Sequence, residues 1–321
     1  MMPNVQELGG KLSRVRDGLD RVILGQSRVK EQLLVCLLAG GHALLEGVPG
    51  TGKTLLGLTL ARLVGCKFRR IQFTPDLMPV DLLGTNVFNP QTQAFDFHAG
   101  PIFTDILLAD EVNRTPPRTQ SALLEAMQEH AATIDGTRRA ISDVFLVIAT
   151  QNPIEFEGTY PLPEAQRDRF LLKIMVDYPK VEEESGMLEA YATGRRLHEE
   201  PAAGMAPELA KEELVAARKL LSTGVRAEKG VQKYILDIVR STRGHESLQF
   251  GAGPRASLAL LESGRALAAL RGRDFVTPDD VKELVPAVLA HRVSLAPEAE
   301  MEGLGLEDVL RRIFEKVEVP R

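Results

Sequence analysis

A glycine-rich stretch from Gly47 to Thr54, with the sequence GVPGTGKT, constrains this chain more than any other feature. Two glycines bracket four residues and Lys-Thr follows, which is the full pattern of a phosphate-binding loop. The apolar residues 43–45 precede the loop like a buried strand, and residues 54–61 follow it with helical spacing. The stretch therefore predicts a strand, a phosphate-binding loop and a helix, in that order.

The residue types in this loop suit a bound nucleotide. Glycines allow backbone N–H groups to surround phosphate oxygens, and the start of the helix adds the positive end of its dipole. Lys53 is expected to reach the terminal phosphates, and the Thr54 hydroxyl to coordinate Mg²⁺. A glycine-rich turn that only caps a helix is the plainer alternative, but such a turn does not require Lys-Thr. The predicted nucleotide-binding residues here are Gly47, Val48, Pro49, Gly50, Thr51, Gly52, Lys53, Thr54 and Leu55.

Composition excludes several other classes of protein. The 321 residues suffice for about two domains and carry a net charge of −5. An acidic chain with no Trp and four Tyr is a poor candidate for a nucleic-acid-binding surface. The first ten residues do not resemble a signal peptide, and the longest apolar run, residues 33–39, is too short to cross a membrane. We therefore expect a cytoplasmic protein with no membrane insertion, in which Cys36 and Cys66 are reduced.

The first part of the chain, residues 1–178, has the pattern of an α/β domain. Helices are expected over residues 5–19 and 27–39, with Ser27 as the N-cap of the second. Helical segments then alternate with apolar runs typical of buried strands. The strand candidates are residues 43–46, 68–73, 106–109, 144–149 and 170–176. This alternation predicts a parallel, doubly wound sheet of five strands.

Two β-hairpins are expected as insertions into this domain. Around residues 85–98, Phe95 and Phe97 alternate with polar residues after an Asn-Pro turn. Around residues 130–143, short β-prone segments flank an Asp-Gly turn.

From residue 179 onward the sequence predicts helices alone. They are expected at about residues 182–196, 211–221, 227–243, 254–270 and 277–291. The last has Thr277 as its N-cap, Pro278 at the first helical position and the acidic Asp280 at the third. We therefore predict an α/β core over residues 1–178 and an all-helical domain over residues 179–321.

Asp110 and Glu111 follow the apolar residues 106–109. Carboxylates at the C-terminal end of a parallel strand face the same crevice as the phosphate loop. Asp110 is therefore expected to hold Mg²⁺, and Glu111 to orient or deprotonate the attacking water. A strand that runs into an ordinary acidic turn is the alternative, and the presence of the phosphate loop weighs against it.

Four other polar residues are weaker candidates on their own. Asn152 follows a buried strand, where it would polarise the attacking water, although Asn before Pro is also typical of turns. Arg167 and Arg169 precede the last strand of the core, and Arg255 begins a helix of the second domain. If one of these arginines contacts the nucleotide bound to a neighbouring subunit, its guanidinium would neutralise negative charge in the transition state. A solvated or ion-paired surface position is the default interpretation of each arginine.

Together these residues resemble the AAA+ ATPases and, more closely, their MoxR family, nearly from end to end. The resemblance rests on residues 22–26, 47–54, 110–114, 124–129, 149–153, 163–170 and 251–255. It implies a five-stranded core with a helical lid, ATP/ADP and Mg²⁺ as cofactors, and a ring of subunits, usually a hexamer. The two hairpins would be the helix-2 insert and the pre-sensor-1 insert of this clade.

The resemblance also implies roles for single residues. By position, Asn152 would be sensor 1, Arg169 the arginine finger and Arg255 sensor 2, while Gly25 and Gln26 would line the adenine pocket. Two positions depart from the family pattern, which usually has Leu at 167 and Ser at 253. Arg167 therefore leaves open which arginine is the finger, with Arg169 favoured because it directly precedes the strand. Whether Arg255 acts in its own subunit or on a neighbour stays open as well.

The family's activity is chaperone-like remodelling or assembly of protein clients, often with partners that carry a von Willebrand factor A domain. The resemblance thus implies an ATPase that acts on proteins. A nucleic-acid motor is the first alternative, supported only by Arg138 and Arg139 on the second hairpin. A nucleotide-gated scaffold with little turnover is the second, and the presence of both Glu111 and Asn152 weighs against it.

Overall fold

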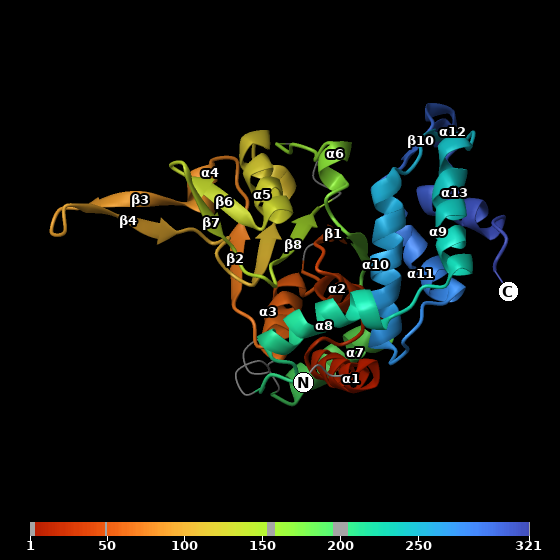
Figure 1. Ribbon diagram of the computed structural model, residues 1–321, viewed down its shortest axis with the longest axis horizontal. Helices are drawn as coiled ribbons and strands as arrows, with labels where there is room; N and C mark the ends of the chain where they lie inside the picture. The colour runs from red at the N-terminus through yellow and green to blue at the C-terminus, as the bar shows by residue number, and fades with distance from the viewer. Residues whose placement is uncertain (1–3, 49, 153–157, 195–204, 321) are drawn as a thin grey trace.

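The computed structural model describes residues 4–48, 50–152, 158–194 and 205–320. A parallel sheet lies at its centre, with the strand order β2-β5-β8-β1-β9 (Figure 1). The strands are β1 (Ala43–Gly47), β2 (Phe68–Gln72), β5 (Ile106–Asp110), β8 (Leu146–Gln151) and β9 (Leu172–Val176). The sheet confirms the predicted five-stranded parallel core. Pro49, a predicted loop residue, lies outside the described residues.

The position of each strand follows from its side chains. The apolar residues 106–109 of β5 are fully buried, as expected for a strand that is covered on both faces. β2, with the sequence FRRIQ, lies at one edge of the sheet and is partly exposed. β1 runs beside β9, and the pair ends with Gly47 opposite Val176. A Cβ atom on Gly47 would lie 2.1 Å from the carbonyl oxygen of Val176, so only glycine fits there.

Helices cover both faces of the sheet. They are α1 (Val5–Val22), α2 (Ser27–Ala39), α3 (Lys53–Leu63), α4 (Pro79–Leu83), η1 (Val112–Arg114), α5 (Pro117–Glu129) and α6 (Glu164–Arg167). The expectation that Ser27 caps α2 is wrong, because Ser27 is the first helical residue and Gln26 is the N-cap. Gln26 has a left-handed backbone (φ 53°), and its side chain donates to the phosphate loop instead of capping the helix.

Two antiparallel hairpins extend from the core. One pairs β3 (Gly84–Asn89) with β4 (Ala94–Ala99), and the other pairs β6 (Ala131–Ile134) with β7 (Thr137–Ala140). The β3–β4 hairpin projects from the body as a long arm (Figure 1). Phe88 and Phe95 near its tip are exposed and pack edge to face, with ring centroids 5.4 Å apart.

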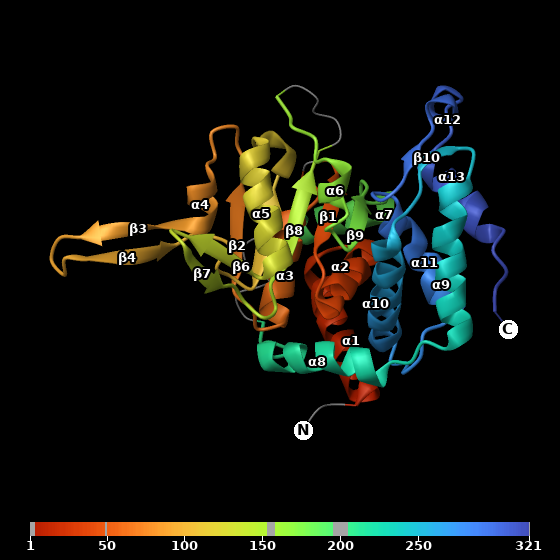
Figure 2. The ribbon, with the colours of Figure 1, turned by 45° about the horizontal axis from the view of Figure 1, so that its top comes forward.

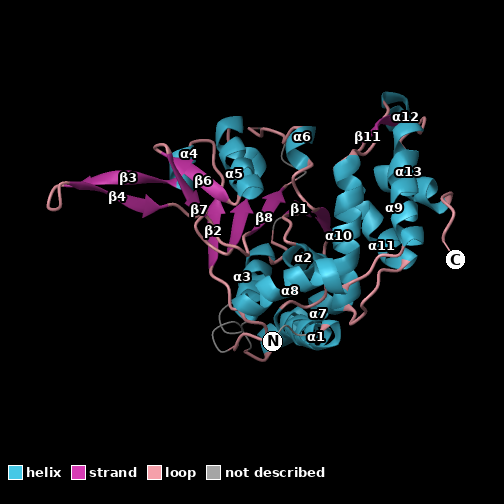
Figure 3. Ribbon diagram, in the orientation of Figure 1, coloured by secondary structure: helices cyan, strands magenta, loops and turns pink. Residues whose placement is uncertain are grey.

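The C-terminal part is mostly helical (Figure 3). Its helices are α7 (Val181–Ala192), α8 (Lys211–Gly224), α9 (Lys229–Ser241), η2 (Thr242–Gly244), α10 (Pro254–Leu270), α11 (Pro278–Leu289), α12 (Pro297–Met301) and α13 (Leu306–Glu315). α11 begins as predicted, with Thr277 as N-cap and Pro278 at the first helical position. The prediction of helices alone is wrong at one place, because β10 (Leu248–Phe250) and β11 (Ser294–Leu295) form a small antiparallel sheet. Strands of two or three residues are too short to leave a periodic pattern.

One hydrophobic cluster joins the two parts of the chain. It includes buried side chains of α1, α2, β1 and β9 together with those of α8, α10 and α11. In Figure 2, α10 stands beside α2 while α8 runs across the base of the molecule. A smaller cluster fills the other face of the sheet beneath α5. No helix of the described residues is long and apolar enough to span a membrane. The domain boundary near residue 178 stays a prediction.

The buried His42 makes stability depend on pH. Its Nδ1 accepts from the backbone N–H of Val147 at 3.0 Å, and its Nε2 lies 3.1 Å from the carbonyl oxygen of Met127. Burial lowers the pKa of His42 to about 4. Between pH 6.5 and 4 the unfolded chain therefore binds a proton that the folded chain does not. Acidification across this window is expected to lower the free energy of unfolding by up to about 3 kcal/mol through this one group.

Denaturant titrations at pH 7.5 and 4.5 test this expectation. His42→Gln should be less stable than the wild type at pH 7.5 but lose less stability on acidification. His98→Gln, on the exposed face of the β3–β4 hairpin, is the matched control and should keep the wild-type dependence on pH. An unchanged pH dependence in His42→Gln would show that another group takes up the proton.

Candidate functional site

The phosphate loop starts at the end of β1 and ends in the first turn of α3, where Lys53, Thr54 and Leu55 lie. Gly50 and Gly52 have φ values of 81° and 79°, in the left-handed region that favours glycine. A Cβ atom at either position would meet nothing within 4 Å, so the loop presents open backbone. The result is a cradle of N–H groups at the N-terminus of an 11-residue helix, the arrangement that suits a phosphate group.

Lys53 lies between this loop and a group of carboxylates. Its Nζ donates to the carbonyl oxygen of Gly47 at 2.6 Å. Burial lowers the pKa of Lys53, while the nearby charges of Asp110, Glu111 and Glu46 act to raise it. The ammonium group is thus close enough to the ends of β1 and β5 to interact with both.

Asp110 is the last residue of β5, and both of its carboxylate oxygens are engaged. The Thr150 hydroxyl donates to Oδ1 at 2.6 Å and accepts from the N–H of Glu111 at 2.8 Å. The guanidinium of Arg70 donates to Oδ2 through Nη2 at 2.6 Å and through Nε at 3.2 Å. A cationic side chain therefore neutralises the carboxylate that the sequence predicts as the metal ligand.

Glu111 directly follows β5 in a left-handed conformation (φ 56°). Its Oε2 accepts from Nε2 of Gln72 at 2.7 Å and lies 3.1 Å from Nε of Arg114. Gln72 in turn accepts from Nη2 of Arg70 at 3.0 Å. Because Arg70 and Gln72 are two residues apart on β2, their side chains lie on one face of the strand and engage the two carboxylates together.

Three polar residues that were not predicted from the sequence also contact the two carboxylates: Arg70, Gln72 and Thr150. Arg70 and Gln72 alternate along β2, and Thr150 is near the end of β8, where the sheet places it beside Asp110. The sequence does carry a signal for them, because each is a polar residue in or near the last residues of a predicted parallel strand. That signal alone does not show which strands lie next to β5. The strand order of the structure shows that these neighbours are β2 and β8.

Asn152 directly follows β8. β8 lies between β1 and β5 in the sheet, so Asn152 emerges between the strand that leads to the phosphate loop and the strand that ends in Asp110. This is the position expected of a side chain that contacts a terminal phosphate or its attacking water.

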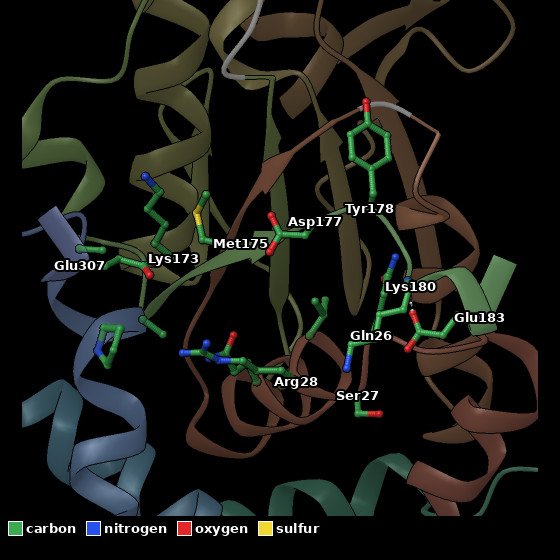
Figure 4. A pocket seen from close by; sticks show the side chains of 15 residues that line it. Gln26, Ser27, Arg28, Lys173, Met175, Asp177, Tyr178, Lys180, Glu183 and Glu307 are labelled. Atoms are coloured by element: carbon green, nitrogen blue, oxygen red, sulfur yellow. Dashed lines mark hydrogen bonds between the residues drawn. The ribbon is translucent and has the colours of Figure 1, made fainter. Parts of the chain in front are cut away.

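A cavity of about 380 Å³ has Gln26, the residue before α2, in its wall (Figure 4). It lies among the start of α2, the chain that leaves β9 and the helix α11, with Gln26, Asp177 and Tyr178 in its lining. Nε2 of Gln26 donates to the carbonyl oxygen of Thr51 at 3.0 Å, which ties the cavity wall to the loop. Gly25 is left-handed (φ 69°), and a Cβ atom there would lie 2.0 Å from the Glu183 carboxylate carbon.

The candidate arginines form a second group around α6. Arg167 lies in α6, with Nη2 3.9 Å from Oε1 of Glu164. Arg169 follows α6, is half-buried and makes no ion pair with any described residue. Arg255, the second residue of α10, lies 3.6 Å from Oδ2 of Asp168 through Nη1. The structure thus places Lys53, Asp110 and Glu111 at the same C-terminal edge of the sheet, and Arg255 beside Asp168, the residue before Arg169.

Comparisons with known proteins agree with this architecture. Residues 42–172 match the model of the ATPase family associated with various cellular activities (AAA), and residues 240–313 match that of the AAA lid domain. A crystal structure of a candidate ATPase from Cytophaga hutchinsonii superposes with a TM-score of 0.89 and is 39% identical, covering 98% of this chain and 96% of that one.

Two relatives extend the similarity over the whole chain. YeaC of Bacillus subtilis (strain 168), whose function is uncharacterized, is 45% identical over 98% of this chain and 97% of its own length. Chaperone MoxR1 of Mycobacterium tuberculosis (strain ATCC 25618 / H37Rv) is 44% identical over 97% of this chain and 82% of its own length. The chain therefore belongs to the MoxR family of AAA+ ATPases.

Proposed function

We propose that this protein is an Mg²⁺-dependent ATPase that works as a ring, usually a hexamer, and uses hydrolysis to remodel or assemble protein clients. The observation that carries the proposal is that the phosphate loop with Lys53 follows β1 and the pair Asp110 and Glu111 lies at the end of β5, at the same C-terminal edge of the parallel sheet with only β8 between the two strands. These are the charges that phosphoryl transfer to water requires: a cation for the phosphates, a ligand for the metal and a base for the water.

The residues present fit ATP and Mg²⁺. The open, left-handed glycine cradle suits the phosphates, and the cavity beside Gln26 suits the base. Thr54 and Asp110 would hold Mg²⁺, an ion that prefers oxygen ligands and neutralises phosphate charge when bound. Arg70 is the cation on Asp110 in this structure, so it has to move for the carboxylate to accept a metal.

The chain's own residues would then divide the work of hydrolysis. Lys53 turns from the carbonyl oxygen of Gly47 to the phosphates. Glu111 releases Gln72 and takes the proton of the attacking water, while Asn152 orients that water. Arg169 supplies a positive charge to the nucleotide of the neighbouring subunit.

Two contacts bear on the choices that the sequence left open. Arg167 is turned toward Glu164 of its own helix, whereas Arg169 makes no ion pair with the described residues, which supports Arg169 as the finger. Arg255 pairs with Asp168, the residue directly before Arg169. If Arg169 faces a neighbouring subunit, Arg255 faces it too, and we propose that both act in trans.

The contacts of the second hairpin support a protein client over a nucleic acid. Arg138 lies 3.5 Å from Oε2 of Glu129, and the guanidinium of Arg139 stacks 3.8 Å from the ring centroid of Phe97. Both arginines, on which the nucleic-acid alternative rested in the sequence, thus have partners within the subunit. We propose a cytoplasmic location and a protein partner, such as one with a von Willebrand factor A domain, for which the exposed Phe88 and Phe95 offer an apolar contact.

Phosphate release from Mg-ATP tests the proposed function. Lys53→Ala is expected to lower the rate at least about 100-fold, because the charge that holds the terminal phosphates is lost. Lys219→Ala, at an exposed position of α8, should keep the wild-type rate. Chelation of Mg²⁺ should abolish release from the wild type. A wild-type rate no higher than that of Lys53→Ala in any oligomeric state would contradict the ATPase proposal and favour the nucleotide-gated scaffold.

A further inference from the structure

Arg292, just beyond the end of α11, is the most thoroughly engaged arginine around the finger segment. Its side chain is 4% exposed. Nε donates to Oδ1 of Asp168 at 2.8 Å, Nη2 to the carbonyl oxygen of Phe170 at 2.6 Å, and Nη1 to that of Leu171 at 3.1 Å. A buried guanidinium with this many partners fixes the groups that it binds, because every alternative position leaves a buried charge unpaired.

The preceding residue strengthens the same attachment. His291 is buried, and its Nε2 lies 2.9 Å from the carbonyl oxygen of Phe170, the atom that Arg292 also contacts. The chain after α11 therefore holds the backbone on both sides of Arg169: Asp168 before it and Phe170 after it. The lid and the segment that presents Arg169 are bound to each other through buried groups.

Asp168 has a second oxygen, and this one faces a different arginine. Oδ2 lies 3.6 Å from Nη1 of Arg255, at the start of α10. The side chain of Arg255 is 56% exposed, whereas that of Arg292 is 4% exposed. One partner of Asp168 is thus buried, and the other is largely exposed to solvent.

We propose that Asp168 is a positioning residue that presents Arg169 and Arg255 together to the neighbouring subunit's nucleotide. Through Arg292 it fixes the backbone that carries Arg169. Through its second oxygen it holds Arg255 beside that backbone and reduces the repulsion among the three guanidinium groups. The proposal rests on the proposed function, because it assigns Asp168 a part in hydrolysis in trans.

A purely structural Asp168 would serve only to neutralise Arg292. The two roles predict different kinetics. Loss of positioning in trans should lower kcat and leave KM for ATP unchanged, because ATP binds to the other subunit's phosphate loop. Loss of structure alone should lower the fraction of folded, active protein and the denaturation midpoint together.

A double-mutant cycle with Asp168→Asn and Arg255→Ala tests the proposal. Asn keeps the shape of Asp168 and its acceptor oxygen for Arg292, but it lacks the charge that holds Arg255. We expect Asp168→Asn alone to lower kcat about tenfold, with KM within about twofold. In the Arg255→Ala background the same change should cost less than about threefold, since Arg255 is gone and the asparagine oxygen still accepts from Arg292, which fixes the backbone of Arg169.

Asp274→Asn is the matched control, because Asp274 pairs with an exposed arginine, Arg226, at 3.4 Å. It should leave kcat unchanged in both backgrounds. Asp168→Glu keeps a charge beside Arg292 but moves it by one methylene, so it should fold even if Asp168→Asn does not, and it should still lower kcat with KM unchanged.

Fully additive effects of Asp168→Asn and Arg255→Ala in an active enzyme would overturn the positioning role and leave the ATPase proposal standing. A fall in kcat that only tracks the loss of folded protein would do the same. A wild type with no turnover above Lys53→Ala would overturn both proposals at once. The wild-type rate, measured first, separates these failures.

Discussion

Glu111→Gln is expected to bind ATP normally but hydrolyse it about 10²–10³ times more slowly than the wild type. Glutamine has nearly the same shape as glutamate, yet it cannot accept the proton of the attacking water. The pocket beside Gln26 and the cradle of Gly50 and Gly52 are untouched by the change. Phosphate release under single-turnover conditions, together with retention of labelled ATP on gel filtration, measures the two properties separately.

A matched control exists for Glu111→Gln, and the same variant also tests for a protein client. Glu125→Gln, at an exposed position of α5, removes the same charge away from the site and should behave like the wild type. Near-normal turnover in Glu111→Gln would show that another group is the base. Because the variant holds ATP without hydrolysing it, it should also retain a protein client that Lys53→Ala does not, and identification of that client would test the remodelling proposal.

Arg169→Ala is expected to lower kcat by about 10³ or more, because a finger guanidinium neutralises charge that develops only in the transition state. Arg167→Ala removes the same group two residues away and is the matched comparison. Its guanidinium already faces Glu164, so we expect less than a tenfold loss. Steady-state hydrolysis by the two purified variants measures the difference. Equal losses, or a larger loss in Arg167→Ala, would assign the finger to Arg167.

Mixed rings test whether Arg169 acts on a neighbour. Arg169→Ala and Lys53→Ala should each be inactive alone. When they are mixed in equal amounts and allowed to reassemble, an intact phosphate loop from one meets an intact Arg169 from the other at some interfaces. Random assembly makes roughly a quarter of the interfaces complete, so we expect about that share of wild-type activity. No recovery in rings shown to be mixed would mean that Arg169 acts within its own subunit.

Features with a local signal could be predicted from the sequence. The glycine loop, the acidic end of β5 and the capping pattern at Thr277 are each encoded within a few neighbouring residues. The five parallel strands followed from apolar runs alternating with helices. These are the cases in which the chemistry of a short segment alone decides its conformation.

Features that depend on how distant segments are arranged in space could not be predicted from the sequence. Arg70 meets Asp110 because β2 and β5 pair in one particular register, with Gln72 opposite Asp110. Arg292 and Asp168 are 124 residues apart in the sequence, and no local pattern around either residue predicts their contact. The N-cap of α2 was misassigned to Ser27 because the amide of Gln26 bonds to the phosphate loop, a tertiary contact that overrides the usual cap preference.

The pairing of β1 with β9 has a consequence for how subunits in a ring would communicate. β1 leads into the phosphate loop, and β9 follows the segment that carries Arg169. The two strands are hydrogen-bonded neighbours, and their register ends with Gly47 opposite Val176, where a Cβ atom on Gly47 would lie 2.1 Å from the carbonyl oxygen of Val176. Under the proposed function, the loop that binds one nucleotide and the segment that carries Arg169 to the next subunit are therefore joined through one pair of adjacent strands. In such a ring, we would expect a change at one nucleotide to reach the Arg169 segment across this one strand pair.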